Sequence, residues 1–468
     1  MGLTRFRSIN IESIIEPRIE SSNKSCYVEK QMQVKMPWGR DGELVLDLPS
    51  HWQVLAQASP AGMPALADLT RAIHQALDQP QGASSLENLI PGDGSVALVV
   101  DDISRPTPAH LLAPPLVQRL LAAGVDPERI SLIFALGTHR AMTKSEMRSR
   151  VTPQVFDRIQ CLNHDCRDAT GLVRLGKTRF GTEVGFNRVA AEAKLRILIG
   201  TIEPHPQAGF GGGLKNLLPG VAGAETIGHN HLLMPSPAQY HMIGTDPDAN
   251  PMRQDIEEAA RMLPGQTFIL NSVLNPQGEA ARVVAGDPIS AHRQGLAAAR
   301  QIYCVPIPRP ADVILSNSHP MDLDLRQGVK AVANMPAAVK KGGVILGFFR
   351  CELGLEQVKL PATFPPMSWL RLLLRGLGSR GIYWLANHLP ASVPVEERFI
   401  INYSLQMLKD YHLLIYSPNL VRDTGGKYRQ MLYDDLPALL ARADQLLGRR
   451  RAEVLVFPQG AVTVPALT

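Results

Sequence analysis

Several short runs of the chain are almost wholly apolar and are separated by segments of helical length, and this pattern constrains the fold more than any other feature. The first three runs lie at residues 95–100 (SVALVV), 130–136 and 196–201. Runs of this length without polar alternation are typical of strands that are covered on both faces. Later runs continue the series at residues 267–274, 313–317, 344–349, 413–416 and 454–457. Strands that alternate with helices predict an α/β protein with mostly parallel sheets.

The length of the chain indicates more than one domain. A chain of 468 residues with 45% apolar side chains is too long for one ordinary hydrophobic core. The proline-rich stretch at residues 305–310 (VPIPRP) is typical of a connection between domains. The sequence predicts a polar N-terminal extension over residues 1–30, an N-terminal α/β domain over residues 31–300 and a C-terminal α/β domain over residues 301–468. We expect the active site in the cleft between the two α/β domains.

Charge and cysteine content narrow the class of protein. The formal net charge is +5, and the longest basic run, Arg449-Arg450-Arg451, is too short to indicate nucleic-acid binding. The five cysteines form no CxxC pair, which favours a reducing compartment. The first residues lack the apolar core of a signal peptide, and no run approaches the ~20 apolar residues that cross a membrane. We therefore expect a cytoplasmic protein without a membrane or nucleic-acid partner.

Polar residues collect where the predicted strands end. The strand at residues 95–100 runs directly into DDISRPTP, in which Asp102, Ser104 and Arg105 carry both charge signs. In α/β sheets, ligands bind at the carboxyl ends of strands. An arginine fork can hold a carboxylate or a phosphate through two hydrogen bonds, so this loop is a candidate anion mount. A salt-bridged turn is the structural alternative.

Two histidines follow the next two predicted strands in the same manner. His139 comes just after the strand at residues 130–136, and His205 comes just after the strand at residues 196–201. A single histidine at a strand end is more often structural. Two that converge on one site are a natural acid–base pair, because the pKa of histidine lies near neutral pH.

A glycine-rich loop with a lysine follows His205. The sequence AGFGGGLK contains Gly211, Gly212 and Gly213, and then Lys215 at the start of a predicted short helix. Consecutive glycines let backbone N–H groups approach an anion, and a helix N-terminus adds its dipole. The string is not a Walker loop, because Asn216 stands where that motif needs a hydroxyl. Lys215 is therefore a candidate either to hold a phosphate or to act as a nucleophile once its amine is desolvated.

The string GHNH supplies a candidate metal ligand. On a strand, His229 and His231 would form a ligand pair, whereas on a helix they would point apart and only one would reach the site. No HExxH motif or carboxylate-rich ligand set accompanies them, so a zinc site made only of protein ligands is not expected.

The second half of the chain contributes a smaller candidate. Gln327 and Lys330 follow the strand at residues 313–317, and their spacing of three places them on one face of a helix. We expect this face to contribute substrate-binding residues to the cleft. A solvent-exposed helix face is the alternative.

Taken together, these residues resemble the lactate racemase family over roughly residues 90–350. The most specific part is TIEPHPQAGFGGGLKNLLPGVAGAETIGHNH, residues 201–231. The resemblance implies a nickel-pincer nucleotide as cofactor, Ni(II) pyridinium-3-thioamide-5-thiocarboxylic acid mononucleotide. It implies that Lys215 is bonded to the nucleotide through a thioamide and that His231 coordinates the nickel.

The resemblance also implies a racemase or epimerase that inverts C2 of a 2-hydroxy acid. In such an enzyme the C2 hydride moves to and from the cofactor while side chains handle the hydroxyl proton. The residues with implied roles are two acid–base histidines, an aspartate beside the site and three substrate-holding residues: His139, His205, Asp102, Arg105, Gln327 and Lys330. Cofactor-maturation enzymes are implied partners, and a homo-oligomer is compatible with the sequence.

One departure from the family concerns the substrate. Arg326 stands just before the glutamine, where the lactate enzymes tend to have an aromatic residue. A charge there predicts a substrate larger or more polar than lactate, such as a dicarboxylic hydroxy acid or a sugar acid. Trp384 is a candidate for the family's cleft tryptophan. Two other readings stay open: a Mg²⁺-dependent phosphate-binding transferase or dehydratase, and a non-catalytic ligand-binding homologue.

Overall fold

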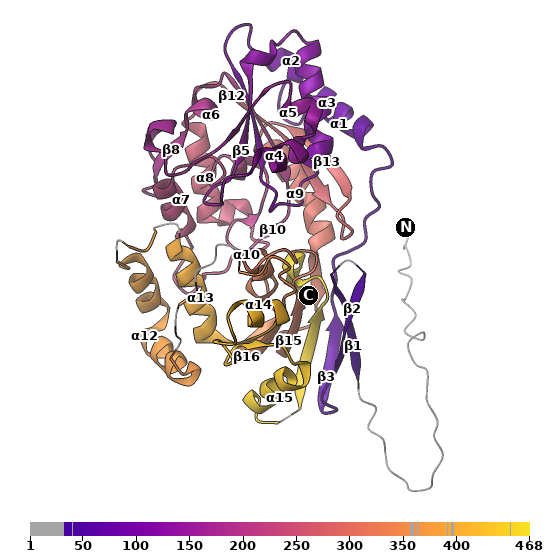
Figure 1. The fold of residues 1–468 in the computed structure, drawn as a ribbon, viewed down its shortest axis with the longest axis vertical. Coiled ribbons are helices and arrows are strands. Elements are labelled where there is room, and N and C mark those ends of the chain that lie inside the picture. Colours follow the sequence, from indigo (N-terminus) through magenta and orange to yellow (C-terminus); the bar gives the residue numbers. More distant parts are fainter. Residues whose placement is uncertain are drawn as a thin grey trace, which may run out of the picture.

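The computed structural model describes residues 32–39, 41–355, 360–361, 363, 365–390, 392–394, 397–449 and 451–468. The predicted N-terminal extension, residues 1–30, lies outside the described residues. The chain forms two α/β units, one above the other in Figure 1, each built on a six-stranded sheet. The α/β prediction is confirmed, and all eight apolar runs named above form strands of these two sheets.

The first sheet carries the strand ends that the sequence singled out. Its order is β13-β12-β9-β4-β5-β6, and all neighbours are parallel except β12 and β13. Alternate residues of each strand face opposite layers, so Leu98 and Val100 pack under one layer of helices and Ala97 and Val99 under the other. The strands are β4 (Val96–Asp101), β5 (Ile130–Ala135), β6 (Gln160–Asn163), β9 (Leu195–Thr201), β12 (Gln266–Leu274) and β13 (Ala280–Gly286).

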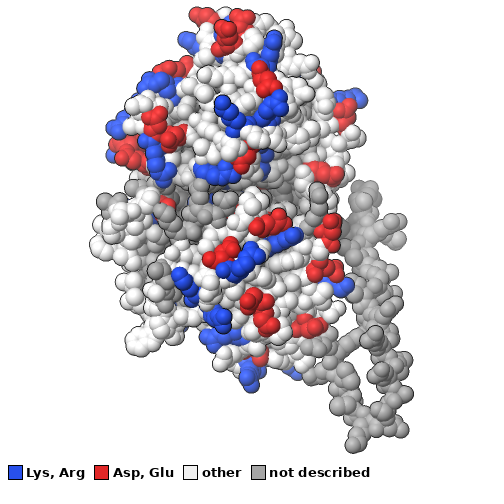
Figure 2. Space-filling view, in the orientation of Figure 1, with Lys and Arg blue, Asp and Glu red and all other residues white. Residues whose placement is uncertain are grey.

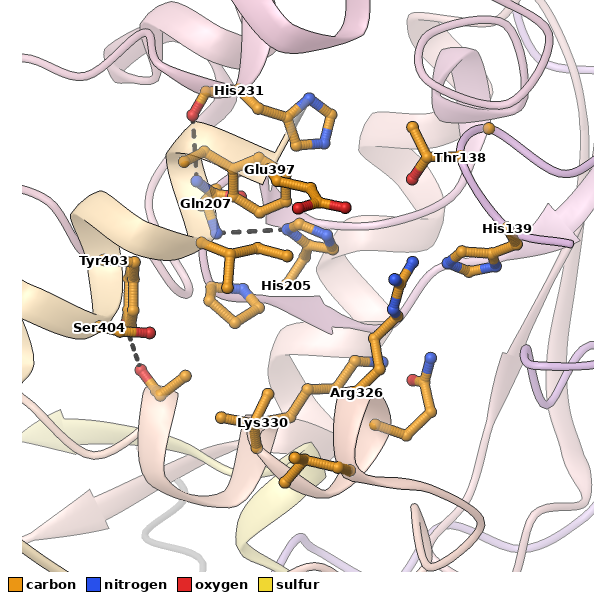
Figure 3. Close-up of a pocket in the computed structure, with 18 of the residues that line it drawn as sticks. Thr138, His139, His205, Gln207, His231, Arg326, Lys330, Glu397, Tyr403 and Ser404 are labelled. Atoms are coloured by element: carbon orange, nitrogen blue, oxygen red, sulfur yellow. Dashed lines mark hydrogen bonds between the residues drawn. The ribbon is translucent and has the colours of Figure 1, made fainter. Parts of the chain in front are cut away.

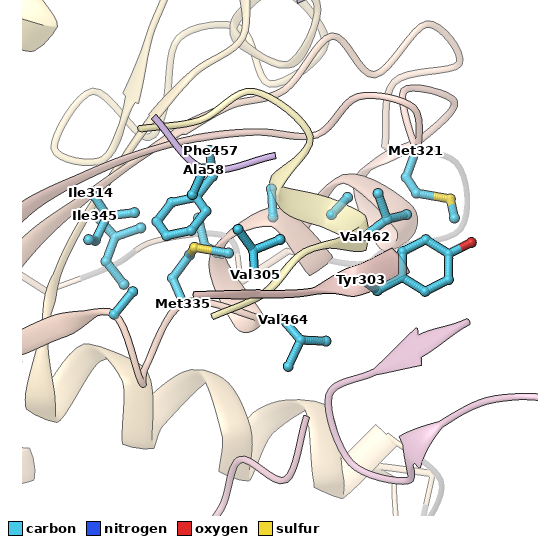
Figure 4. Packing of buried hydrophobic residues seen from close by; sticks show 14 of the residues in the cluster. Ala58, Tyr303, Val305, Ile314, Met321, Met335, Ile345, Phe457, Val462 and Val464 are labelled. Atoms are coloured by element: carbon cyan, nitrogen blue, oxygen red, sulfur yellow. The ribbon is translucent and has the colours of Figure 1, made fainter. Parts of the chain in front are cut away.

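The second sheet is parallel throughout, in the order β18-β17-β16-β15-β19-β3. Ile314, Ile345 and Phe457 fill the core on one side of this sheet, where Figure 4 shows them beside Met335. The strands are β3 (Trp52–Gln57), β15 (Ala311–Asn317), β16 (Val339–Phe348), β17 (His412–Tyr416), β18 (Leu432–Tyr433) and β19 (Ala452–Phe457).

The start of the described chain belongs to the second unit, which corrects the predicted extent of the first. Strands β1 (Gln33–Trp38) and β2 (Gly42–Asp47) form an antiparallel pair, and β3 pairs with β19 near the C-terminus. The apolar residues of β1 and β2, including Val34 and Leu46, pack against Val313 of β15. These strands pack with the second unit because this buries their apolar faces, although the strands lie closer in sequence to residues 58–300.

Helices cover both faces of the sheets. Helix α3 contains two prolines in its interior, Pro114 and Pro115. The carbonyls that these prolines leave without a partner are those of His110 and Leu111, which are exposed to solvent, so the missing hydrogen bonds cost little. The main helices are α1 (Leu69–Asp78), α3 (Ala109–Ala122), α4 (Lys144–Val151), α7 (Ala224–His231), α8 (Pro251–Arg261), α9 (Ser290–Tyr303), α10 (Leu325–Gly328), α11 (Lys330–Ala333), α12 (Met367–Asn387), α13 (Arg398–Asp410) and α15 (Leu436–Leu446). Within the described part of the chain, none of the helices has the length and hydropathy needed to cross a bilayer.

Candidate active site

The loops that follow β4, β5 and β9 meet at one cavity of about 1010 Å³. These three strands are neighbours in the first sheet, so their carboxyl ends lie at the same edge. Residues of the second unit complete the cavity wall. Eleven of the predicted site residues line it: Asp102, Arg105, His139, His205, Gly211, Gly212, Lys215, His231, Arg326, Gln327 and Lys330. Ser104 and Gly213 are not among the lining residues.

Asp102 and His139 form a hydrogen-bonded pair. The Asp102 Oδ2 atom lies 2.5 Å from Nδ1 of His139, and Asp102 Oδ1 accepts hydrogen bonds from the backbone N–H and hydroxyl of Ser104. Burial alone raises the pKa of Asp102, but the hydrogen bond and charge of His139, then Arg105, bring it well below the usual value. The carboxylate therefore stays ionised and accepts a hydrogen bond from Nδ1–H of His139, so that in the neutral ring the lone pair lies on Nε2, where it can act as a base.

His205 is held in the opposite tautomer. Its Nδ1 atom accepts hydrogen bonds from the backbone N–H groups of Gln207 and Ala208, at 3.2 and 3.1 Å. Burial, followed by the charges of Lys215 and Arg105, lowers the pKa of His205 well below its usual value. The neutral ring therefore carries its proton on Nε2, as a hydrogen-bond donor. Figure 3 shows the His139 and His205 rings facing the cavity from different sides.

The glycine loop supports Lys215, and two of its three glycine N–H groups are unavailable to an anion. The N–H of Gly211 donates to the carbonyl of Glu203, and that of Gly213 donates to Asn271 Oδ1 at 2.6 Å, so both are already used. Gly212 has φ +69°, and a Cβ there would lie 2.7 Å from Ile202, so this position requires glycine. The loop is a closely packed turn that delivers Lys215 to the cavity.

A buried arginine that the sequence analysis missed donates hydrogen bonds to the backbone of this loop. Arg253 of α8 donates to the carbonyls of Phe210, Gly211 and Gly212, and His292 lies 2.9 Å from the Gly211 carbonyl. Inside a protein, the N–H donors of a buried guanidinium are typically paired with several acceptors, here three carbonyl oxygens. Nothing near Arg253 in the sequence signals this role, because the contacts span about forty residues.

Lys215 places a buried amine in the cavity wall, and within the described residues this amine has no hydrogen-bond partner. Burial first, then the positive charges of Arg105 and Arg253, lower the pKa of Lys215 well below its usual value. A neutral, desolvated amine is a competent nucleophile, as the second of the two predicted roles requires.

His229 and His231 lie on helix α7, which settles the alternative that the sequence left open. On a helix the two rings diverge. His231 is buried in the cavity wall and its Nδ1 donates to the carbonyl of Ile227 at 2.9 Å, whereas His229 is half-buried and lies 2.8 Å from the hydroxyl of Thr182. Burial, then Lys215, lowers the pKa of His231 to about 3. Its Nε2 therefore keeps a free lone pair, the form of imidazole that binds metals.

The second unit supplies the opposite wall. Gln327 lies in α10 and Lys330 at the start of α11, and both line the cavity, as their spacing predicted. Arg326 also lines it, and Figure 3 shows this side chain projecting into the cavity. Trp384 does not belong to the cavity wall, because α12 packs outside the second sheet. Its side chain is 61% exposed and stacks on His388.

Glu203 is a second residue that the sequence analysis missed, although it lies only two positions before His205. It is buried, and its Oε1 lies 3.5 Å from both Arg105 Nη1 and Lys330 Nζ. The carboxylate therefore joins a cation of the first unit to a cation of the second and offsets part of their charge. Phe399 of α13 was also missed; its ring packs 4.8 Å from that of His231.

Comparisons with known proteins agree with this site. The sequence profile described as the lactate racemase N-terminal domain matches residues 40–241. The lactate racemase of Thermoanaerobacterium thermosaccharolyticum is 28% identical over 324 residues, which cover 69% of this chain and 75% of the relative. The lactate racemase of Lactiplantibacillus plantarum is 31% identical over 280 residues, 58% of this chain and 64% of the relative.

Solved structures show the same fold. The lactate racemase apoprotein from T. thermosaccharolyticum superposes with a TM-score of 0.76 at 22% identity, covering 93% of this chain and all of that one. A Thermotoga maritima protein superposes with a TM-score of 0.60 at 20% identity, covering 85% of this chain and 98% of that one. The residues matched by the family profile include the strand ends and loops that build the cavity, and the chain is similar to lactate racemases in both sequence and fold.

Proposed function

We propose that the chain is a racemase or epimerase that inverts C2 of a 2-hydroxy acid with a nickel-pincer nucleotide bound to Lys215. The observation that carries the proposal is the Lys215 amine, which is buried in the cavity and has no hydrogen-bond partner among the described residues. A lysine that only held an anion would need its charge, whereas burial lowers the pKa of Lys215 and so disfavours the charged form.

The residues present fit such a cofactor. His231 presents one imidazole lone pair to the cavity, and among the described residues no group of three or more His, Cys, Asp or Glu side chains could hold a metal by itself. A nickel ion at His231 would therefore take its remaining ligands from the nucleotide. When bound, the cofactor would supply the acceptor and donor of the C2 hydride. The Mg²⁺-dependent phosphate enzyme fits less well, because the N–H groups of Gly211 and Gly213 are already paired.

The side chains of the cavity would transfer the hydroxyl proton and bind the substrate carboxylate. Nε2 of His139, backed by the ionised Asp102, is placed to take the substrate's hydroxyl proton, since the carboxylate stabilises the imidazolium that forms. His205 is placed to donate from Nε2 to the substrate oxygen. Arg105 and Lys330 would hold the substrate carboxylate, and Glu203 between them keeps the two cations close.

The substrate is proposed to be larger or more polar than lactate. Arg326 stands where the resemblance leads us to expect an aromatic side chain, and it lines the cavity. A dicarboxylic hydroxy acid or a sugar acid would give this guanidinium a partner. The cytoplasmic location and the need for cofactor-maturation enzymes remain predictions.

Retention of the hydrogen at C2 tests the proposed reaction. Enzyme produced in a host that makes the cofactor should interconvert the two enantiomers of a C2-deuterated 2-hydroxy acid in ordinary water. The deuterium should remain on C2 of the product, because a hydride is returned to the carbon that lost it. NMR and chiral chromatography measure both outcomes. Loss of the label to solvent would instead show that a base removes the C2 proton, and the hydride route would then be wrong.

Nickel content distinguishes the two histidines of α7. His231→Ala should lose bound nickel and racemisation, because it removes the imidazole that faces the cavity. His229→Ala should retain most of both, since that ring contacts Thr182. Metal analysis of the two purified variants, each with its melting temperature as a folding control, gives the comparison. Equal nickel loss in both variants would mean that the ligand is assigned wrongly.

A further inference from the structure

Helix α12 carries an exposed apolar face that the catalytic site does not explain. Among the described residues, fourteen large apolar side chains are exposed, and six of them lie in this one helix. Single exposed apolar residues are common, but such a cluster on one element marks a binding surface. Trp369 and Leu372 are 73% and 71% exposed. We call these six residues the α12 face: Trp369, Leu372, Leu373, Leu377, Trp384 and Leu385.

The spacing of these residues shows that the helix is two-sided. Before the kink at Gly378, positions 369, 372, 373 and 377 recur at helical intervals on the outer side, while Leu374 is buried. After the kink, Ile382 and Ala386 are buried and Trp384 and Leu385 point outward. Leu374 and Ile382 pack against Leu408 of α13, so the inner side already has its partner.

The segment that carries this face has charged residues of one sign only. Residues 357–395 contain one lysine, three arginines and no aspartate or glutamate. Arg371 is buried and donates to the carbonyl of Tyr411. Arg375 and Arg380 are exposed, and in the described structure neither pairs with a carboxylate. The helix therefore presents two free positive charges beside its apolar face.

Helix α12 also lies on the outside of the second unit, where an extended binding partner can contact it. In Figure 1, α12 and α13 stand at the side of the second unit, with α12 outermost, and on the side of this flank that Figure 2 shows the surface is mostly white. The two helical segments of α12, which meet at Gly378, both expose tryptophan or leucine side chains near an arginine, and this composition is typical of helices that lie in the interface of a membrane.

We propose that the α12 face binds peripherally to an anionic lipid surface, with its leucines and tryptophans entering the headgroup region and Arg375 and Arg380 contacting lipid phosphates. The expectation that the protein has no membrane partner rested on the absence of a spanning segment, and peripheral binding needs none. The charge argues against a second copy of this chain as the partner. A symmetric pairing through α12 would bring arginines toward arginines, with no acidic residue of this segment to offset them.

Vesicle flotation tests the proposal with the protein as purified, without need of cofactor. The wild-type chain should float with vesicles of 70% phosphatidylcholine and 30% phosphatidylglycerol at low salt, and much less with pure phosphatidylcholine. Arg375→Gln with Arg380→Gln should weaken this binding by about thirtyfold, at the typical contribution of a basic residue near an anionic surface. Leu372→Gln with Leu373→Gln should abolish it, because the apolar anchor is lost. A blue shift of tryptophan emission should accompany wild-type binding.

Matched control variants distinguish specific binding through the α12 face from nonspecific adsorption to vesicles. Leu111→Gln removes an exposed leucine on α3, and Arg174→Gln removes an exposed arginine on β7 (Leu172–Lys177); both variants should bind vesicles as the wild type does. No flotation of the wild type, or equal flotation of all variants, overturns the proposal. Sedimentation of the protein without vesicles tests whether the α12 face is instead an interface between two copies of the chain. If the wild type is a dimer that the leucine variant dissociates, the α12 face is a subunit interface and the lipid proposal is wrong.

Discussion

Replacing Lys215 with alanine is expected to remove the covalently bound nucleotide and all racemase activity while the protein remains folded. Activity should fall to the uncatalysed background, because the hydride acceptor is no longer retained in the site. Folding should survive because burial of an unpaired amine opposes stability, so its loss offsets the cavity that the truncation leaves. Intact-protein mass, racemisation rate and thermal melting of the variant measure the three parts.

Lys330→Ala is the matched control for this variant. Lys330 is also a buried lysine of the same cavity with a pKa lowered by burial, but it lies 3.5 Å from Glu203. It is therefore proposed to bind substrate and not the cofactor. The Lys330 variant should keep the covalent mass and the nickel and lose catalytic efficiency through a higher KM. Full activity in Lys215→Ala, or loss of the covalent mass in both variants, would contradict the assignment.

Removal of either catalytic histidine is expected to slow turnover by about 10²–10⁴-fold, the usual contribution of general acid–base catalysis. His139→Ala removes the imidazole whose Nδ1–H donates a hydrogen bond to Asp102. His205→Ala removes the ring that donates from Nε2. A complete inversion needs a proton acceptor and a proton donor on the substrate oxygen, so both variants should be slow over the full cycle.

The half-reactions should separate the two roles. Each variant is expected to reduce its cofactor once with one pure enantiomer and not with the other, because the enantiomers present their hydroxyls in different directions. Single-turnover absorption spectra with each enantiomer record this. Asp102→Asn is the companion variant: it keeps the shape of the His139 environment but removes the charge that stabilises the imidazolium. Equal reduction by both variants with both enantiomers would mean that one shared base does the work.

The sequence was sufficient for most of the first unit and for the side chains of its site. The strands are buried on both faces, and their continuous apolar runs distinguish them from the helices between them. Because Asp102, His139 and His205 each follow such a strand, their convergence followed from the rule that parallel strands end at one edge of a sheet.

The remaining features depend on contacts between distant parts of the chain. Strand β3 (Trp52–Gln57) joins a sheet whose other members begin at residue 311, and no local pattern signals that pairing. Glu203 stands in the quoted motif, but its importance appears only when Arg105 and Lys330 are seen on either side of it. The tautomer of His205 is likewise set by two backbone N–H groups, which a sequence pattern does not report.

The mass of the tryptic peptide that contains Lys215 tests the central claim most directly. Trypsin cleaves after unmodified lysine, so the unloaded chain should give a peptide of residues 197–215. Protein from a nickel-supplied host that makes the cofactor should instead give residues 197–253, with the cleavage at Lys215 blocked and the mass increased by the bound nucleotide. An unmodified 197–215 peptide from enzyme that is active and contains nickel would contradict the covalent assignment.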